Sequence, residues 1–142
     1  MVVSPSATQA IIARPFGQPH QAIVSYRDQH LIVGSGQLNG TMGDRTRPTD
    51  MLLAALATDC IFACQDAAMI ADMSLYSMAV TAQWRAESAD GQIDMSQGIR
   101  LRIAMSGPDA EQKTELTQAI MSRSATYRLL AQAIPVVIEI GG

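Results

Sequence analysis

The sequence predicts an α+β fold in which runs of strands are interrupted by helices. Three observations support this prediction: strand-like segments fill the first third of the chain, an almost uncharged helical run covers residues 47–73, and further strands and helices follow it. Because strands come in runs and do not alternate strictly with helices, the pattern is typical of an α+β fold. A chain of 142 residues is long enough for one core, and we expect a single domain over residues 1–142.

The first third of the chain is predicted to be β-structure. Three strands are expected there, at residues 7–13, 21–26 and 29–34. Pro15 and Gly17 are expected to end the first strand, and the dipeptide Arg27-Asp28 to form the turn between the second and third. Residues 34–48 form a glycine-rich loop that no Gly-Lys-Ser/Thr sequence follows, so a phosphate-binding P-loop is not expected.

The run at residues 47–73 is predicted to be a long central helix. It is expected to begin near Pro48, with Thr49 as N-cap and Asp50 at the positive end of the helix dipole, and to end within residues 71–74. The run is too polar at its ends and centre for a membrane span and too apolar all round for a surface helix. A buried central helix is therefore predicted.

The second half of the chain is predicted to add a hairpin, two helices and a closing strand. The expected strands are residues 75–87, 93–105 and 134–140, and the expected helices are residues 106–122 and 125–132. Residues 89–91 form the turn of the hairpin, which has one solvent-exposed face because apolar and polar side chains alternate along it. Ser124 is expected to cap the last helix.

Composition limits the classes of function. Hydrophobic residues make up 48% of the chain and charged residues 16%, which favours an obligate homodimer that hides apolar surface. A net charge of −3 gives no basic surface for nucleic acid, and we expect no membrane segment or signal peptide. Two cysteines four residues apart fit the reducing cytoplasm, and the isolated His20 and His30 give no metal-site spacing, so no metal or other cofactor is expected.

The order of elements, with a cysteine in the middle of the first long helix, resembles the OsmC/Ohr family (osmotically inducible protein C and organic hydroperoxide resistance protein). Residues 48–60, PTDMLLAALATDC, resemble the Pro-x-[DE]-x-Leu-Leu-x-Ala-Ala-Leu-x-x-Cys helix start of that family. Residues 124–130, SATYRLL, and the strand at 134–140 resemble its Cys-Pro-Val-Ser-x-x-Leu segment and terminal strand. The resemblance implies an intertwined homodimer with two long helices at its centre and active sites at the interface.

The resemblance also implies a thiol peroxidase. In that chemistry one cysteine attacks an organic hydroperoxide and becomes a sulfenic acid, which condenses with a second cysteine, and a dithiol then reduces the disulfide. Cys60 falls on the attacking position. Asp50 falls on an acidic position that holds an activating arginine, for which Arg45 is the first choice and Arg47 the second. Since ten helical residues span about 15 Å, Asp50 is expected to approach the thiol of a second copy of the chain.

The chain departs from the family at the second cysteine, whose position falls on Ser124. Serine cannot form a disulfide, so a sulfenic acid at Cys60 would need an external thiol or dithiol. Cys64 lies one helical turn after Cys60, but nearly parallel Cβ directions oppose a disulfide between them, and buried apolar filler is the simpler interpretation of Cys64. Asp59 would raise the pKa of the adjacent thiol if both were buried; otherwise it faces water or pairs with an arginine.

Two functions remain open within the resemblance. The first is a homodimeric peroxidase that reduces organic hydroperoxides through Cys60 with an external thiol or dithiol. The second is a homodimer of the same fold without peroxidase activity, which binds an apolar small molecule or serves a structural role. A fold unrelated to the family is a third alternative, and a monomer in solution would favour it.

Overall fold

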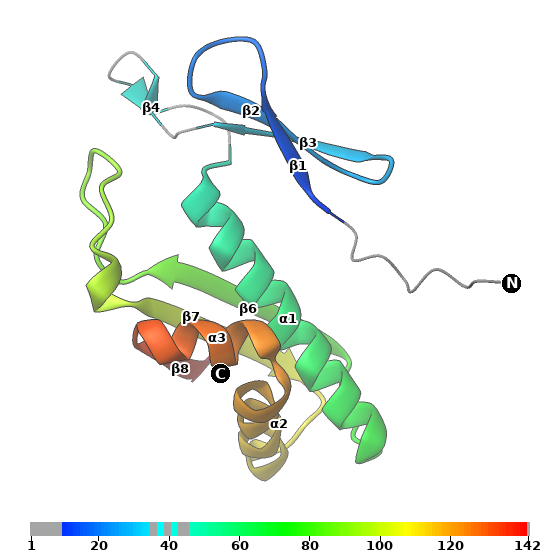
Figure 1. Cartoon of the computed structure of the whole chain (residues 1–142). Helices are drawn as coiled ribbons and strands as arrows, with labels where there is room; N and C mark the ends of the chain where they lie inside the picture. Colours follow the sequence, from blue (N-terminus) through cyan, green and yellow to red (C-terminus); the bar gives the residue numbers. More distant parts are fainter. Residues whose placement is uncertain (1–9, 35–36, 39–40, 43–45, 142) are drawn as a thin grey trace, which may run out of the picture. The chain divides into compact units, whose positions relative to one another are not determined.

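The computed structural model describes residues 10–34, 37–38, 41–42 and 46–141. It divides into two compact units, residues 1–50 and 51–142, which are considered one at a time below (Figure 1). The predicted α+β class is confirmed, with a three-stranded sheet in each unit, a long helix, two further helices and a closing strand.

The first unit contains an antiparallel three-stranded sheet. Its strands are β1 (Ile12–Pro15), β2 (Gln21–Tyr26) and β3 (Gln29–Gly34), in the order β1-β2-β3. Tyr26 pairs with Gln29, so the turn predicted at Arg27-Asp28 is confirmed, and Arg27 has a φ of 54° there. Two short strands, β4 (Gln37–Leu38) and β5 (Thr41–Met42), pair with each other inside the predicted glycine-rich loop.

The predicted end of the first strand was wrong. β1 continues through Pro15, which pairs with Ala22 of β2, whereas residues 7–9 of the predicted strand lie outside the described residues. β1 is an edge strand of its sheet, so the missing N–H of Pro15 removes no bond that the ladder requires.

The long helix α1 (Pro48–Ile70) begins at Pro48, one residue before Thr49, which was predicted to be its N-cap. Pro48 is its first residue, where a missing N–H is tolerated, so Thr49 lies inside the helix and is not its N-cap. The backbone N–H of Arg47, just before the helix, donates to the carboxylate of Asp50 at 3.1 Å, as the acidic residue of a capping box does. The helix ends at Ile70, because Asp72 adopts a φ of 54° and the N–H of Met73 bonds the carbonyl of Ala68.

The sheet of the second unit is mixed. It contains β6 (Ser77–Trp84), β7 (Ile99–Ser106) and β8 (Val136–Gly141); β7 lies in the middle, antiparallel to β6 and parallel to β8. The inward side chains of β7 are buried, and the outward Arg100 and Arg102 form ion pairs of 3.3 and 3.4 Å with Glu139. The predicted exposed face is therefore confirmed.

Both predicted hairpin strands were too long. Residues 95–97 form a short 3-10 helix, η1 (Met95–Gln97), and β7 begins only at Ile99. Gly98 accounts for this start: its φ is 82°, and a Cβ there would overlap the carbonyl of Pro135, which accepts a hydrogen bond of 2.9 Å from Ile99. The pairing of β6 likewise covers only residues 77–84 of the predicted 75–87.

Two shorter helices complete the second unit. In α2 (Ala110–Arg123), Asp109 and Gln112 form a capping box, so the helix begins later than the predicted residue 106. α3 (Ala125–Ala133) follows after one residue, Ser124, whose side chain accepts from Tyr127 N–H and confirms the predicted cap.

The core of the second unit lies between the helices and the inward face of the sheet. Side chains of α1 and α2 pack there against β6 and β7, and α3 adds partly buried side chains at the margin. The fully buried members are Leu56, Cys60, Cys64, Ile99, Leu101, Ile103, Leu116 and Ile120. Both cysteines are therefore part of the core.

Candidate functional site

Asp59 and Ser124 form the contact between α1 and the junction of α2 with α3. The hydroxyl of Ser124 donates to Asp59 Oδ2 at 2.6 Å, and the backbone N–H of Thr126 donates to the same oxygen at 3.0 Å. The Ser124 hydroxyl in turn accepts from the N–H of Tyr127 at 3.0 Å. Asp59 of α1 and the cap residue Ser124 thus act together: they accept hydrogen bonds from two of the first N–H groups of α3, those of Thr126 and Tyr127.

The contact favours the charged form of Asp59. The hydrogen bond from Ser124 lowers the pKa of this carboxyl below its ordinary value, and the bond from Thr126 adds to the effect, while partial burial opposes both. The carboxylate also lies at the positive end of the α3 dipole, which stabilises negative charge. Ser124 is only 1% exposed, so the hydrogen bond is shielded from water.

Cys60 has the surroundings of a core residue. It is fully buried, and burial raises the pKa of its thiol to about 12, with further increases from Cys64 and Asp59. The thiolate is the form that attacks peroxides, and a reactive cysteine requires a cation or a helix N-terminus to lower its pKa. Every influence identified on Cys60 acts in the opposite direction.

Cys64 is also buried, and its thiol is used within the fold. Its Sγ lies 3.6 Å from the carbonyl oxygen of Leu116, to which the thiol donates a weak hydrogen bond, and burial raises its pKa to about 11. Both cysteines are free thiols. This fits the interpretation of Cys64 as core filler, with the addition that it links α1 to α2.

Asp50 does pair with an arginine, whereas the activation of a cysteine by that arginine stays a prediction. Asp50 forms a two-point ion pair with Arg47, with Nη2 to Oδ1 at 2.7 Å and Nε to Oδ2 at 3.0 Å, and this pairing is the largest cause of the lowered pKa of Asp50. Arg47 was the second choice for that arginine. Arg45, the first choice, lies outside the described residues.

Asp59 and Cys60 are neighbours in sequence but point in different directions. Successive helix residues are rotated by about 100°, so one faces the start of α3 and the other faces the core. Of these two side chains, Asp59 is the one that is hydrogen-bonded to Ser124. The pairing of Asp59 with Ser124 could not be predicted from local patterns, because the two residues are 65 positions apart.

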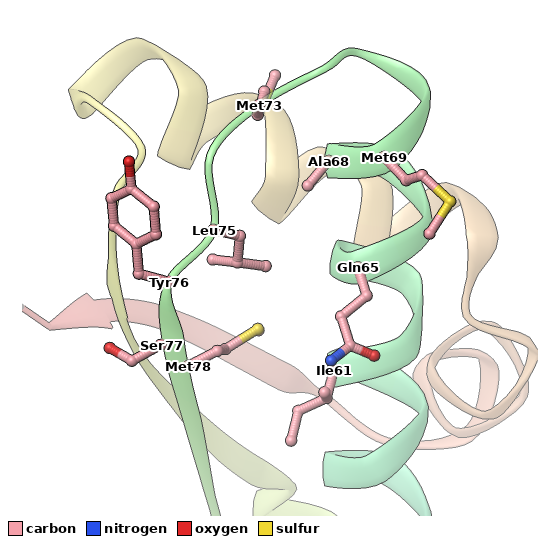
Figure 2. Close-up of a pocket in the computed structure, with 9 residues that line it drawn as sticks. All are labelled: Ile61, Gln65, Ala68, Met69, Met73, Leu75, Tyr76, Ser77 and Met78. Atoms are coloured by element: carbon pink, nitrogen blue, oxygen red, sulfur yellow. The ribbon is translucent and has the colours of Figure 1, made fainter.

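A hollow of about 310 Å³ lies elsewhere in the second unit, between the C-terminal half of α1 and the segment that leads into β6 (Figure 2). Three methionines line it, Met69, Met73 and Met78, together with Gln65 and Ser77. Within the described part of the chain, no three His, Cys, Asp or Glu side chains come together as metal ligands would.

The fold and the site together define the class of protein. It is an α+β protein with a long central helix that contains a cysteine, and with a capped junction before α3. A family model described as "OsmC-like protein" matches residues 41–139, and the chain belongs to this family. The predicted resemblance is confirmed. A comparison with curated proteins gives no match.

Solved structures share the fold along almost the whole chain. An OsmC-like protein from Mycoplasma pneumoniae matches with a TM-score of 0.75 and 13% identity over 96% of this chain and 98% of its own. An organic hydroperoxide resistance protein OsmC from Legionella pneumophila gives 0.73 and 16% over 98% and 100%. The organic hydroperoxide resistance protein OhrB of Bacillus subtilis gives 0.67 and 15% over 94% and 98%. At these identities the matches establish the fold.

Proposed function

We propose that this chain is a homodimeric OsmC-family protein without thiol peroxidase activity, which binds an uncharged apolar small molecule in the cytoplasm. The hydrogen bond between Asp59 and Ser124 carries the proposal. Residues that condense into a disulfide must face each other with their Cβ atoms about 4 Å apart. If Ser124 occupies the second-cysteine position, then the complementary position on α1 is the residue that faces it, which is Asp59.

A carboxylate at that position cannot act as a thiol nucleophile. Neither Asp59 nor Ser124 can give up two electrons to form a disulfide, and their hydrogen bond requires no reductant. The pair therefore joins α1 to α3 permanently, where two cysteines would join them only when oxidised. This explains why a chain with the family fold has Ser124 at the second position.

The state of Cys60 supports the same conclusion. Since burial raises the pKa of the Cys60 thiol to about 12, the thiol is protonated at pH 7 in the folded protein. The side chain is also inaccessible to a hydroperoxide, since it is fully buried. We infer that Cys60 is a core residue here.

The exposed apolar surface of α1 supports a homodimer. In its most apolar 18-residue window only 28% of residues are buried, and Phe62 and Met69 are 55% and 79% exposed. Among the described residues, α1 is the one helix long and apolar enough to cross a membrane, a test that core helices of soluble proteins also meet. A second copy that covers this face would convert α1 into such a core helix.

Reduction of organic hydroperoxides through Cys60 is the second candidate. The names of the Legionella pneumophila and Bacillus subtilis structures favour it, since both are organic hydroperoxide resistance proteins. In that reaction the Cys60 thiolate would take the terminal oxygen of the peroxide, the O–O bond would break, an alcohol would leave, and an external dithiol would reduce the sulfenic acid.

One experiment separates the two candidates. The purified protein, its Cys60→Ser variant and a protein-free blank are each given cumene hydroperoxide and dihydrolipoamide, and peroxide loss is followed while both cysteines are mapped by mass spectrometry. We expect equal rates in all three samples and unmodified Cys60. Rapid consumption that Cys60→Ser abolishes would contradict the proposal and establish the peroxidase.

A further inference from the structure

The exposed face of α1 carries a regular stripe of side chains. Its members are separated alternately by four and three positions, a spacing that keeps them on one side of the helix and is typical of a coiled-coil interface. The first member is partly buried and all the others are exposed. They form what we call the α1 seam: Met51, Ala55, Thr58, Phe62, Gln65 and Met69.

The two halves of the α1 seam differ in the size of their side chains. Ala55 and Thr58 are small, whereas Phe62, Gln65 and Met69 in the second half are large. If two copies of the chain paired in parallel, each seam residue would face itself, so two Phe62 rings would collide and two Ala55 methyl groups would leave a gap. In an antiparallel pair, the large side chains of one copy lie opposite the small side chains of the other. Close packing therefore favours the antiparallel arrangement.

We propose that the α1 seams of two copies pair antiparallel around a twofold axis at position 60. Seam residues equally distant from that position then face each other: Phe62 faces Thr58 of the second copy, Gln65 faces its Ala55, and Met69 faces its Met51. A twofold contact must be complementary to itself, and this register sets a large residue against a small one at each step up to the flexible methionine pair. The inference rests on the proposed homodimer and adds its orientation and register.

The methionine-lined hollow supports this register. It lies beside the C-terminal half of α1, and its wall includes Gln65 and Met69, as Figure 2 shows. In the proposed register Met51 of the second copy lies over Met69, at the mouth of the hollow. An unbranched thioether side chain adapts to an irregular gap, so Met51 of the second copy can enter it. The hollow, which is open in one copy, is then closed by the other and becomes part of the interface.

The proposed register differs from the one that would bring Asp50 to the Cys60 thiol of the second copy. That arrangement would need the twofold axis at position 55. Because α1 begins at Pro48, the helix of the second copy would then start opposite Phe62, and Met69 and the hollow would stay uncovered. With the axis at position 60, the seam is paired along its whole length. Asp50 then lies about 15 Å along the helix axis from the Cys60 of the second copy.

The test uses pairs of engineered cysteines that cannot meet within one chain. Positions 51 and 69 are separated by about 27 Å along α1, and positions 55 and 65 by about 15 Å, so a disulfide within either pair must join two copies. Met51→Cys with Met69→Cys, and separately Ala55→Cys with Gln65→Cys, are oxidised with diamide, and the disulfides are mapped by mass spectrometry. We expect most of each double variant to become a covalent dimer linked between the two engineered positions. The corresponding single variants should form no covalent dimer.

A matched control and the single variants make each outcome decisive. Met51→Cys with Met121→Cys, whose second cysteine is exposed on α2, should form no disulfide between copies. Self-linkage of Met69→Cys alone would show parallel helices, and self-linkage of Ala55→Cys without it would place the axis at position 55; either result would overturn the inference, as would the absence of the expected links in both double variants.

Sedimentation of the reduced parent chain tests the proposed homodimer separately. A monomer would overturn both the homodimer and the register, whereas a dimer with a different pattern of disulfides would overturn the register alone. Both results are independent of peroxide consumption, which decides whether the chain is a peroxidase.

Discussion

The side chain of Asp59 accepts a 2.6 Å hydrogen bond from Ser124, and through it the middle of α1 is bound to the first turn of α3. The same carboxylate oxygen accepts from the N–H of Thr126, so one side chain provides two of the bonds at this helix start. Ser124 also ends α2, where its N–H bonds the carbonyl of Ile120. Three helices therefore meet at one buried residue, Ser124.

Loss of this hydroxyl should destabilise the protein. Ser124→Ala removes the donor to Asp59 and the acceptor for Tyr127 N–H in a buried position, so we expect a loss of about 1–3 kcal/mol in the free energy of unfolding. Urea denaturation measures it. Ser122→Ala, at an exposed position in the last turn of α2, is the control and should change stability by less than about 0.5 kcal/mol.

The stabilisation from Asp59 should depend on pH. The folded-state pKa of Asp59 lies below its ordinary value of 3.8, so its contribution is complete above about pH 5 and disappears as the pH falls through 3.8 toward the lower folded pKa. Asp59→Asn should therefore be less stable than the parent chain at pH 6, with a smaller difference at pH 3. Thermal unfolding at both values measures this. A difference that stays constant with pH would show that the charge of Asp59 contributes nothing.

Both thiols should be protected in the folded protein. Since the pKa values of Cys60 and Cys64 are about 12 and 11, their reaction with an aromatic disulfide reagent at pH 8 should be much slower than that of free cysteine. In 6 M guanidinium both should react within the mixing time. Rapid reaction of one thiol in the folded protein, assigned to Cys60 by mass mapping, would instead support a reactive centre.

The exposed face of α1 should hold the proposed dimer together. Phe62→Arg introduces a charge on this face, and we expect it to shift the protein from dimer to monomer in sedimentation analysis. Gln132→Arg, on the exposed surface of α3, adds the same charge away from this face and serves as the control. A parent chain that is itself monomeric would remove the dimer from the proposed function.

Much of the fold could be predicted because it depends on local patterns. The alternating apolar positions of residues 99–105 predicted the inward face of β7, and Ser124 before an apolar segment predicted the cap of α3. The strand boundaries failed where a tertiary contact decides them. β7 begins directly after Gly98, because the carbonyl of Pro135 approaches that glycine closely, and the sequence does not show this approach.

The candidate site was harder to predict because it depends on direction around a helix. The sequence placed Cys60 in a central helix, but only the packing of α1 against β7 and α2 shows that its thiol faces the core. The alternatives for Asp59 were water or an arginine; its partners are Ser124 and the N–H of Thr126. The pairing of Asp50 with an arginine was predictable because the two residues are three apart.

The central claim is that position 59, and not position 60, faces position 124. Its most direct test compares two variants under mild oxidation with diamide, followed by disulfide mapping: Ser124→Cys alone, which retains Cys60, and Ser124→Cys with Asp59→Cys. Circular dichroism checks that both variants are folded. We predict a disulfide between positions 59 and 124 in the double variant and none between positions 60 and 124 in the single variant. A disulfide that joins Cys60 to position 124 in the single variant would contradict the account and return Cys60 to the attacking position.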